Sequence, residues 1–252
     1  MRTLPPKGVS GLKPVQILPA PFSQGGGFKG RDVQTALFRR KPRPGGLMDD
    51  PAEDTGVVAF DFDGTLTTRD SFTTFLKWRV SRARYARGMR RLAPAAGAYL
   101  FHRNRGRIKA AAVREFLKGV PRAQLEAEAR AFAEAFAPRL LRPDALHTWR
   151  RWRERRATMV IVTASPDIVV QPFARGLGAD HLIGTRLVFD AEDRVAGVID
   201  GRNCRGPEKV VRLQAHFGAD IRLRAAYGDT SGDREMLKIA DEAGYRVFKD
   251  TP

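Results

Sequence analysis

The chain has 252 residues, of which 42% are hydrophobic, and it carries a formal net charge of +17. This length predicts one large domain or a core domain with a smaller insertion, and the composition allows a sizeable buried core. The single cysteine, Cys204, excludes an internal disulfide framework and fits a reducing compartment, so we expect a cytoplasmic protein. No stretch approaches the roughly 18 apolar residues of a membrane span, so any membrane contact would be peripheral.

Residues 1–54 have a different composition from the rest of the chain. Proline and glycine are frequent there, and no periodic apolar face is present. This pattern predicts a disordered, basic tail. Met48 lies just before the first strand, so an over-extended start is one interpretation of the tail, and a basic presequence is the alternative.

The first strong motif is the apolar run 57–60, followed by Asp61, Asp63 and Gly64. The run predicts a strand buried on both faces, as in the centre of a parallel sheet. Ligands of open α/β sheets bind at the carboxyl ends of the strands, and residues i and i+2 of an extended chain point the same way. The two carboxylates therefore indicate a site, whereas an Asp-Gly hairpin turn is the structural alternative.

A strongly basic, helical insertion follows, which we expect to form a cap over residues 72–149. Residues 76–122 contain fourteen lysines and arginines and one acid, Glu115, around a short apolar stretch at 92–101. Such a segment suits the surface of an anionic membrane or the capture of anionic substrates. A solvated arginine-rich face and a nucleic-acid surface are the alternatives. Pro121 and Pro143 are each expected to open a helix.

The second core strand is predicted at 158–162 and is followed by Thr163, Ala164 and Ser165. We expect Ser165 to cap the next helix, with Pro166 in its first position. The free amides of a helix start suit a phosphate group, although an ordinary capped helix explains the same residues.

The last third of the chain adds more polar residues at the ends of predicted elements. The runs 182–189 and 194–199 predict a peripheral hairpin, and residues 245–248 a final strand. Lys209 lies in the first turn of a helix opened by Gly206 and Pro207, where a cation is disfavoured unless it points into a site; a surface position is the alternative. A third core strand, 223–227, precedes Asp229 and Asp233.

Because parallel strands end at one edge of the sheet, we expect these polar residues to converge. Several carboxylates gathered with one lysine and a hydroxyl group would repel one another without a cation. Mg²⁺ prefers such oxygen ligands and often takes one or two protein carboxylates together with phosphate oxygens.

In this order the motifs resemble those of haloacid dehalogenase (HAD) superfamily phosphatases. The motifs are Asp61–Thr67, Thr163, Lys209, and Asp229 with Asp233. The closest likeness is to the phosphoserine-phosphatase-like branch, whose helical cap lies between the first two motifs. Residues 203–210 and 227–233 also resemble bacterial phosphatidylglycerophosphatase C relatives. The resemblance implies a Rossmann-like α/β core, residues 55–71 and 150–252, with the cap inserted after the first strand.

The resemblance also implies a role for each motif residue. Asp61 would attack phosphorus and become an aspartyl-phosphate, and Asp63 would act as acid and then as base. Thr163, Ala164 and Lys209 would bind the phosphoryl oxygens. Asp61, Asp229 and the Asp63 main-chain carbonyl would bind Mg²⁺. Asp233 would orient Lys209 or a water molecule on the metal.

Three departures bear on the substrate. Asp70 stands where phosphoserine phosphatases carry a glutamate that reads the substrate amine, and Ala164 and Ser165 replace two glycines. The cap insertion at 92–101 is less hydrophobic than in the lipid-phosphatase relatives. These departures count against phosphoserine and also weaken the likeness to the lipid phosphatases. The sequence predicts a Mg²⁺-dependent phosphomonoesterase, and the charge of the cap favours a membrane-borne substrate, with phosphatidylglycerophosphate as the leading candidate. A small soluble phosphomonoester is the enzymatic alternative, and a membrane- or nucleic-acid-binding protein on the same fold is the non-enzymatic one.

Overall fold

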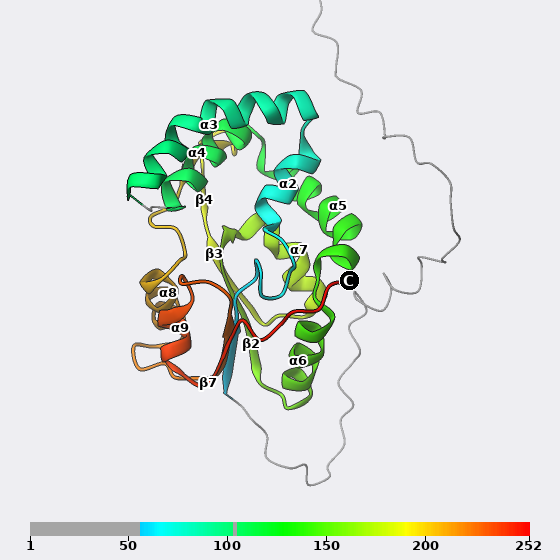
Figure 1. Ribbon diagram of the computed structural model, residues 1–252, viewed down its shortest axis with the longest axis vertical. Helices are drawn as coiled ribbons and strands as arrows, with labels where there is room; N and C mark the ends of the chain where they lie inside the picture. Colours follow the sequence, from blue (N-terminus) through cyan, green and yellow to red (C-terminus); the bar gives the residue numbers. More distant parts are fainter. Residues whose placement is uncertain (1–55, 103–104) are drawn as a thin grey trace, which may run out of the picture.

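A computed structural model describes residues 56–102 and 105–252 of the chain, with side chains 94–107 outside that description (Figure 1). The tail predicted at residues 1–54 lies outside the described residues. The chain folds around a parallel sheet, with further helices above one end of it. None of the helices within the described ranges is long and apolar enough to cross a membrane.

The central sheet has the strand order β3-β2-β1-β6-β7, and all its neighbours pair in parallel. Its strands in chain order are β1 (Val57–Phe60), β2 (Thr158–Pro166), β3 (His181–Thr185), β6 (Leu223–Gly228) and β7 (Ala240–Tyr245). β1 lies in the middle, and its residues alternate between two apolar layers: Val58 and Phe60 pack on one side and Ala59 on the other. This double burial explains its uninterrupted apolar sequence.

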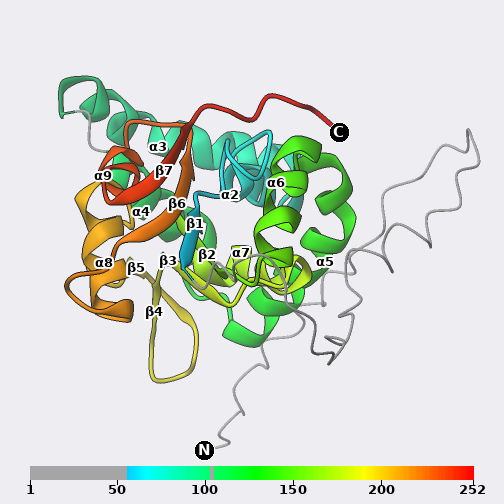
Figure 2. The same cartoon turned by 90° about the horizontal axis from the view of Figure 1, so that it is seen from below.

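Helices cover both faces of the sheet, as the view in Figure 2 shows. One face carries α6 (Pro143–Glu154) and α7 (Asp167–Leu177), and the other carries α8 (Pro207–Phe217) and α9 (Arg234–Lys238). The predicted α/β class with a Rossmann-like sheet is confirmed, and the helix expected at Pro143 begins there.

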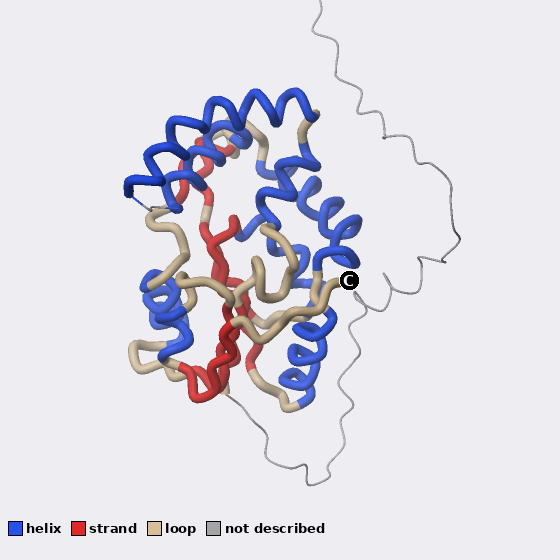
Figure 3. The backbone as a smooth tube through the Cα atoms, in the orientation of Figure 1, coloured by secondary structure: helices blue, strands red, loops and turns tan. Residues whose placement is uncertain are grey.

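The segment between β1 and α6 is helical, as predicted. It contains α2 (Ser71–Arg79), α3 (Arg82–His102), α4 (Arg105–Leu117) and α5 (Arg122–Leu140). Helices α3 and α4 lie side by side beyond the carboxyl end of the sheet (Figures 1 and 3). We call these two the cap helices. The exact division between core and cap stays a prediction.

Two predictions for the later strands are wrong in detail. The run 182–189 is not one hairpin strand, because its first half joins the main sheet as β3 and only β4 (Leu187–Phe189) pairs with β5 (Val195–Ile199). The hairpin of β4 and β5 forms outside the central sheet, as predicted, and the amide of Gly119 donates to the Val195 carbonyl at 2.8 Å and connects it to the end of α4. The last strand ends at Tyr245, where we expected it to begin.

Candidate active site

Asp61 follows β1 directly and stays in line with the sheet. Its amide donates to the Tyr227 carbonyl of β6 at 2.9 Å, and the residue is only 6% exposed. One carboxylate oxygen, Oδ1, accepts a hydrogen bond from Nζ of Lys209 at 2.6 Å. Sheet pairing and the lysine therefore fix both the backbone and the side chain of Asp61.

Lys209 reaches Asp61 from the first turn of α8 and is 1% exposed. Its Nζ also donates to Oδ1 of Asp233 at 2.7 Å and to the Val162 carbonyl at 2.6 Å. An ammonium group has three donors, so these acceptors use all of them. The surface alternative for Lys209 is wrong, because its first-turn position directs it into a buried ionic cluster.

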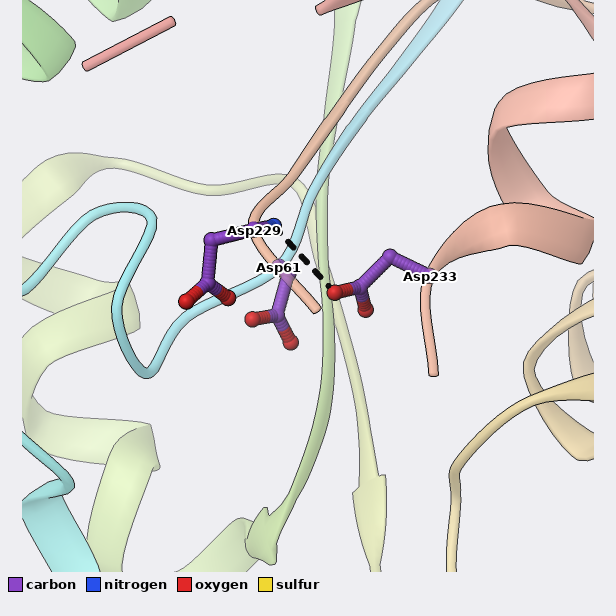
Figure 4. Close-up of side chains that lie close together, drawn as sticks. All are labelled: Asp61, Asp229 and Asp233. Atoms are coloured by element: carbon purple, nitrogen blue, oxygen red, sulfur yellow. Dashed lines mark hydrogen bonds between the residues drawn. The ribbon is translucent and has the colours of Figure 1, made fainter. Parts of the chain in front are cut away.

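The side chains of Asp61, Asp229 and Asp233 converge at the carboxyl ends of β1 and β6 (Figure 4). Each offers one oxygen, and the three oxygens lie within 4.8 Å of one another. Oδ2 of Asp233 accepts from the amides of Asp229 and Thr230, at 3.2 and 2.9 Å. Oδ1 of Asp229 is buried and has no hydrogen-bond partner among the described residues. A buried oxygen of this kind is costly unless a cation or proton compensates it.

Gly64 makes room for this acidic group. Its φ is +86°, which favours glycine, and a Cβ added there would lie 2.3 Å from Oδ2 of Asp229. The chain can therefore turn sharply after Asp63 while Asp229 packs against the turn.

The ionisation of the cluster follows from burial and from the charge of Lys209. Burial, partly offset by Lys209, raises the pKa of Asp61 to about 7. Burial also raises the pKa of Asp229, and the nearby charge of Asp233 adds to that shift. Asp233 behaves in the opposite way: although burial acts upward, the Lys209 charge and hydrogen bond hold its pKa below the usual range. Lys209 thus favours the charged form of Asp233 most strongly.

The Asp63 side chain has its own hydrogen-bond donors, separate from Lys209. Its Oδ1 accepts from the Ser71 amide at 2.7 Å, and its Oδ2 accepts from the Ser165 hydroxyl group. Burial raises the pKa of Asp63, and the charge of Asp70 adds to that effect. The prediction that Ser165 caps a helix is wrong, because β2 continues through it and Pro166 is the residue before α7.

Of the other residues expected to bind substrate, two line the cavity that contains Asp61 and one, Thr163, is not part of its lining. Ala164 and Asp70 line the same cavity as Asp61. Asp70 is also the N-cap of α2, accepting from the Thr73 amide at 2.6 Å. Thr163 is fully buried, and its hydroxyl oxygen accepts from the Ser165 amide at 3.0 Å.

A cavity of about 560 Å³ extends from the acidic group toward the cap helices. Its polar end, the acidic floor, consists of Asp61, Asp63, Asp229, Asp233 and Lys209. Its other end, the apolar roof, is formed by side chains of α2, α3 and α4: Phe72, Leu76, Tyr85, Met89, Leu92, Ile108, Ala112 and Phe116. The volume falls within the range of small-molecule sites.

Two residues of this site, Ser165 and Lys109, could not be identified as site residues from the sequence. The sequence pattern predicts a helix cap at Ser165 and does not distinguish Lys109 from the other basic residues of the insertion. Nζ of Lys109, on α4, donates to the Ala164 carbonyl at 2.8 Å and to the Ser165 hydroxyl oxygen at 3.3 Å. The absence of glycine at position 165 was the available signal for Ser165. No comparable local signal marks Lys109.

Comparisons with known proteins agree with this geometry. The model of the family described as haloacid dehalogenase-like hydrolase matches residues 58–238. The chain is 62% identical over 216 residues to Protein CicA of Caulobacter vibrioides, covering 86% of this chain and 95% of CicA.

Two solved structures share the fold at lower identity. A Bordetella pertussis protein of unknown function is 22% identical with a TM-score of 0.60, covering 72% of this chain and 85% of that one. A phosphoserine phosphatase, described as a phospho-aspartyl intermediate analogue, is 21% identical with a TM-score of 0.51, covering 75% and 85%. The family match spans the whole acidic floor, and the chain belongs to the haloacid dehalogenase-like hydrolases.

Proposed function

We propose that this protein is a Mg²⁺-dependent phosphatase that hydrolyses a phosphomonoester through an aspartyl-phosphate on Asp61. The observation that carries the proposal is a buried Asp61 carboxylate, held by Lys209 at 2.6 Å beside Asp229 and Asp233. The phosphoserine phosphatase with the phospho-aspartyl analogue supports it, since that protein has the same fold.

The residues of the floor fit a divalent cation. Asp61 and Asp229 would hold Mg²⁺, with the Asp63 main-chain carbonyl as the third protein ligand that the resemblance implies. The unpartnered Oδ1 of Asp229 supports this assignment, because a hard cation is the partner that a buried carboxylate oxygen lacks there. When bound, Mg²⁺ would supply positive charge that reduces the repulsion between the nucleophile and the phosphate dianion.

The protein side chains then divide the two chemical steps. In the first, an Asp61 oxygen bonds to phosphorus, the bond to the leaving alcohol breaks, and Asp63 gives that alcohol a proton. In the second, water gives a proton to Asp63 and bonds to phosphorus, and the Asp61 carboxylate leaves. Asp63 suits this exchange because its carboxylate is oriented by its own hydrogen bonds, from the Ser71 amide and the Ser165 hydroxyl group, and its pKa is raised.

Lys209 first orients the nucleophile. All three of its N–H groups are used, so it can bind a phosphoryl oxygen only by exchanging one acceptor. Asp61 is the acceptor to be exchanged, because its charge decreases when it becomes an acyl phosphate. Lys209 thereby follows the negative charge from the carboxylate to the phosphoryl group.

The test is release of inorganic phosphate from a panel of phosphomonoesters, with and without Mg²⁺. We expect Mg²⁺-dependent turnover that Asp61→Asn abolishes and that the exposed-residue control Asp220→Asn leaves unchanged. Turnover that survives Asp61→Asn would exclude the nucleophile assignment. A folded wild-type protein inactive on the whole panel would favour a binding protein on this fold.

We further propose that the alcohol part of the substrate is apolar, as in a membrane-lipid phosphate. The apolar roof supports this, because it surrounds the space above the floor where the leaving group of a bound phosphomonoester would lie. Phosphatidylglycerophosphate is the specific substrate to test first. Preference for phosphoserine over lipid phosphates in the panel would instead favour the small soluble substrate.

The charge of residues 76–122 is a second, independent argument for a lipid substrate. Fourteen cations against one acid in residues 76–122 would attract an anionic bilayer. Flotation with vesicles of anionic and of neutral lipid measures this directly. We expect recovery with anionic vesicles alone, decreasing as salt is added, and recovery with neither would contradict membrane contact.

A further inference from the structure

Two side chains outside the expected catalytic set meet at Asp63. Ser165 comes from the end of β2 and Lys109 from α4, one of the cap helices. Ser165 is fully buried, and its hydroxyl group donates to Oδ2 of Asp63. The same hydroxyl oxygen accepts from Nζ of Lys109 at 3.3 Å. The cap is therefore connected to Asp63 through one intervening hydroxyl group.

Hydrogen-bond counting shows that this arrangement is directional. A serine hydroxyl has one hydrogen, and here it is given to Asp63. Lys109 can only donate, so its contact with Ser165 disfavours any rotamer in which that hydroxyl would point its hydrogen at α4. The second Lys109 bond, to the Ala164 carbonyl at 2.8 Å, anchors the ammonium group to β2. The ring of Phe72 lies 5.9 Å from the same Nζ.

Asp63 is consequently held at both oxygens by different parts of the chain. The Ser71 amide, at the start of α2, binds Oδ1 at 2.7 Å, and Ser165 binds Oδ2. The first donor is backbone and would be present whatever residue occupied position 71. The second requires a hydroxyl side chain at 165, which the glycine of the phosphoserine-phosphatase-like motif could not provide.

We propose that Ser165 and Lys109 are positioning residues that orient Asp63 for proton transfer, and that Lys109 makes this orientation depend on docking of α4. The inference rests on the proposed function, since it assigns Asp63 the proton-transfer role. When α4 is docked, Lys109 holds Ser165 and Ser165 holds Asp63. When α4 moves away, Ser165 is free to rotate and Asp63 keeps only its bond to the Ser71 amide.

Kinetics of substitutions at the two positions test the proposal, with p-nitrophenyl phosphate as substrate and saturating Mg²⁺. Hydrogen bonds to charged groups correspond to about 10- to 100-fold in rate. We expect Ser165→Ala and Lys109→Met each to lower kcat by roughly tenfold or more while KM changes by less than about twofold. Lys109→Arg should restore much of the loss. The matched control is Lys238→Met, an exposed lysine of α9, which should retain wild-type kcat.

The double variant separates positioning from substrate contact. Because Lys109 acts through Ser165, we expect Ser165→Ala with Lys109→Met to lose about as much kcat as Ser165→Ala alone. Losses that multiply, or a Lys109→Met variant that raises KM with kcat intact, would show that Lys109 binds substrate and would overturn the proposal. A wild-type kcat in either single variant would overturn it as well.

Crystal structures of the wild type and of Lys109→Met provide a readout that needs no turnover. We expect the Asp63 carboxylate in the variant to lose its bond to Ser165 or to change rotamer. An unchanged Asp63 with both hydrogen bonds intact would refute the proposal even if the enzyme were inactive on every substrate. Failure of the phosphatase assignment itself would appear separately, as a wild-type protein without phosphate release.

Discussion

The acidic floor and the apolar roof enclose one cavity but are built in opposite ways. The floor comes from the ends of strands, the first turn of α8 and the N-cap of α9, and within it Lys209 is bonded to Asp61 at 2.6 Å and to Asp233 at 2.7 Å. The roof comes from helices and has no charge to satisfy. We infer that the floor determines which bond is broken and the roof determines which molecule is bound. Substitutions in the two regions should therefore have different effects.

The largest expected effect is that of Lys209→Met in the floor. It leaves Asp61 and Asp233 buried at 6% and 1% exposure without their cation. Removing one partner of a buried ion pair costs about 3–5 kcal/mol of unfolding free energy. We expect this loss in urea denaturation, together with phosphatase activity near background. Lys238→Met should preserve both, and a stable, active Lys209→Met would show that the floor does not need its lysine.

The Asp229→Asn variant tests the metal rather than the ion pair. It keeps the size of the side chain and removes the charge that the buried Oδ1 would offer to a cation. We expect the Mg²⁺ concentration for half-maximal activity to rise by roughly tenfold or more, because hard cations favour carboxylate ligands. Titration of Mg²⁺ against phosphate release measures it. An unchanged midpoint would remove Asp229 from the metal site.

How much of the molecule could be predicted from sequence also differs between floor and roof. The floor was predictable because polar residues directly following apolar strands can only converge in a parallel sheet. Lys209 carried an additional signal, since a cation in the first turn of a helix opposes the macrodipole. These signals are local, and the fold turns them into one site.

The errors occurred where tertiary packing decides. Residues 182–189 divide between the central sheet and the two-stranded sheet. No local sequence pattern indicates the residue at which the chain leaves the central sheet. β7 contains Asp241 and Glu242 at the edge of the sheet, so its polar composition concealed a strand. Lys109 is one cation among fourteen, and only the docking of α4 brings it to Ser165.

Gly64→Ala is the third test, and it examines how closely the floor is packed. The new Cβ would collide with Asp229 at 2.3 Å, and φ of +86° adds backbone strain. We expect about 1–3 kcal/mol lower stability and a several-fold loss of kcat. The matched control is Gly201→Ala, where φ is +67° but nothing lies within 4 Å of the added atom. If Gly64→Ala and Gly201→Ala lost the same fraction of kcat, backbone strain and not the contact with Asp229 would explain the loss.

The smallest effect, and the most selective one, is expected in the roof. Ala112→Leu adds three carbon atoms to the cavity from α4 and leaves every charged side chain of the site in place. Each methylene of a substrate chain that can no longer enter loses about 0.8 kcal/mol, so kcat/KM should decrease by several-fold for a long-chain alkyl phosphate. For p-nitrophenyl phosphate it should change by less than about twofold.

Ala110→Leu, on the same helix but outside the cavity lining, should leave the ratio between the two substrates unchanged. If Ala112→Leu slows both substrates equally, the roof supports the fold rather than the leaving group. The contrast between the two regions would then have to be explained by packing alone. A change in the ratio at position 112 and none at position 110 would instead assign substrate selection to the apolar side chains that face the cavity. Phosphoryl transfer would then depend on the acids and Lys209 of the floor and not on the roof.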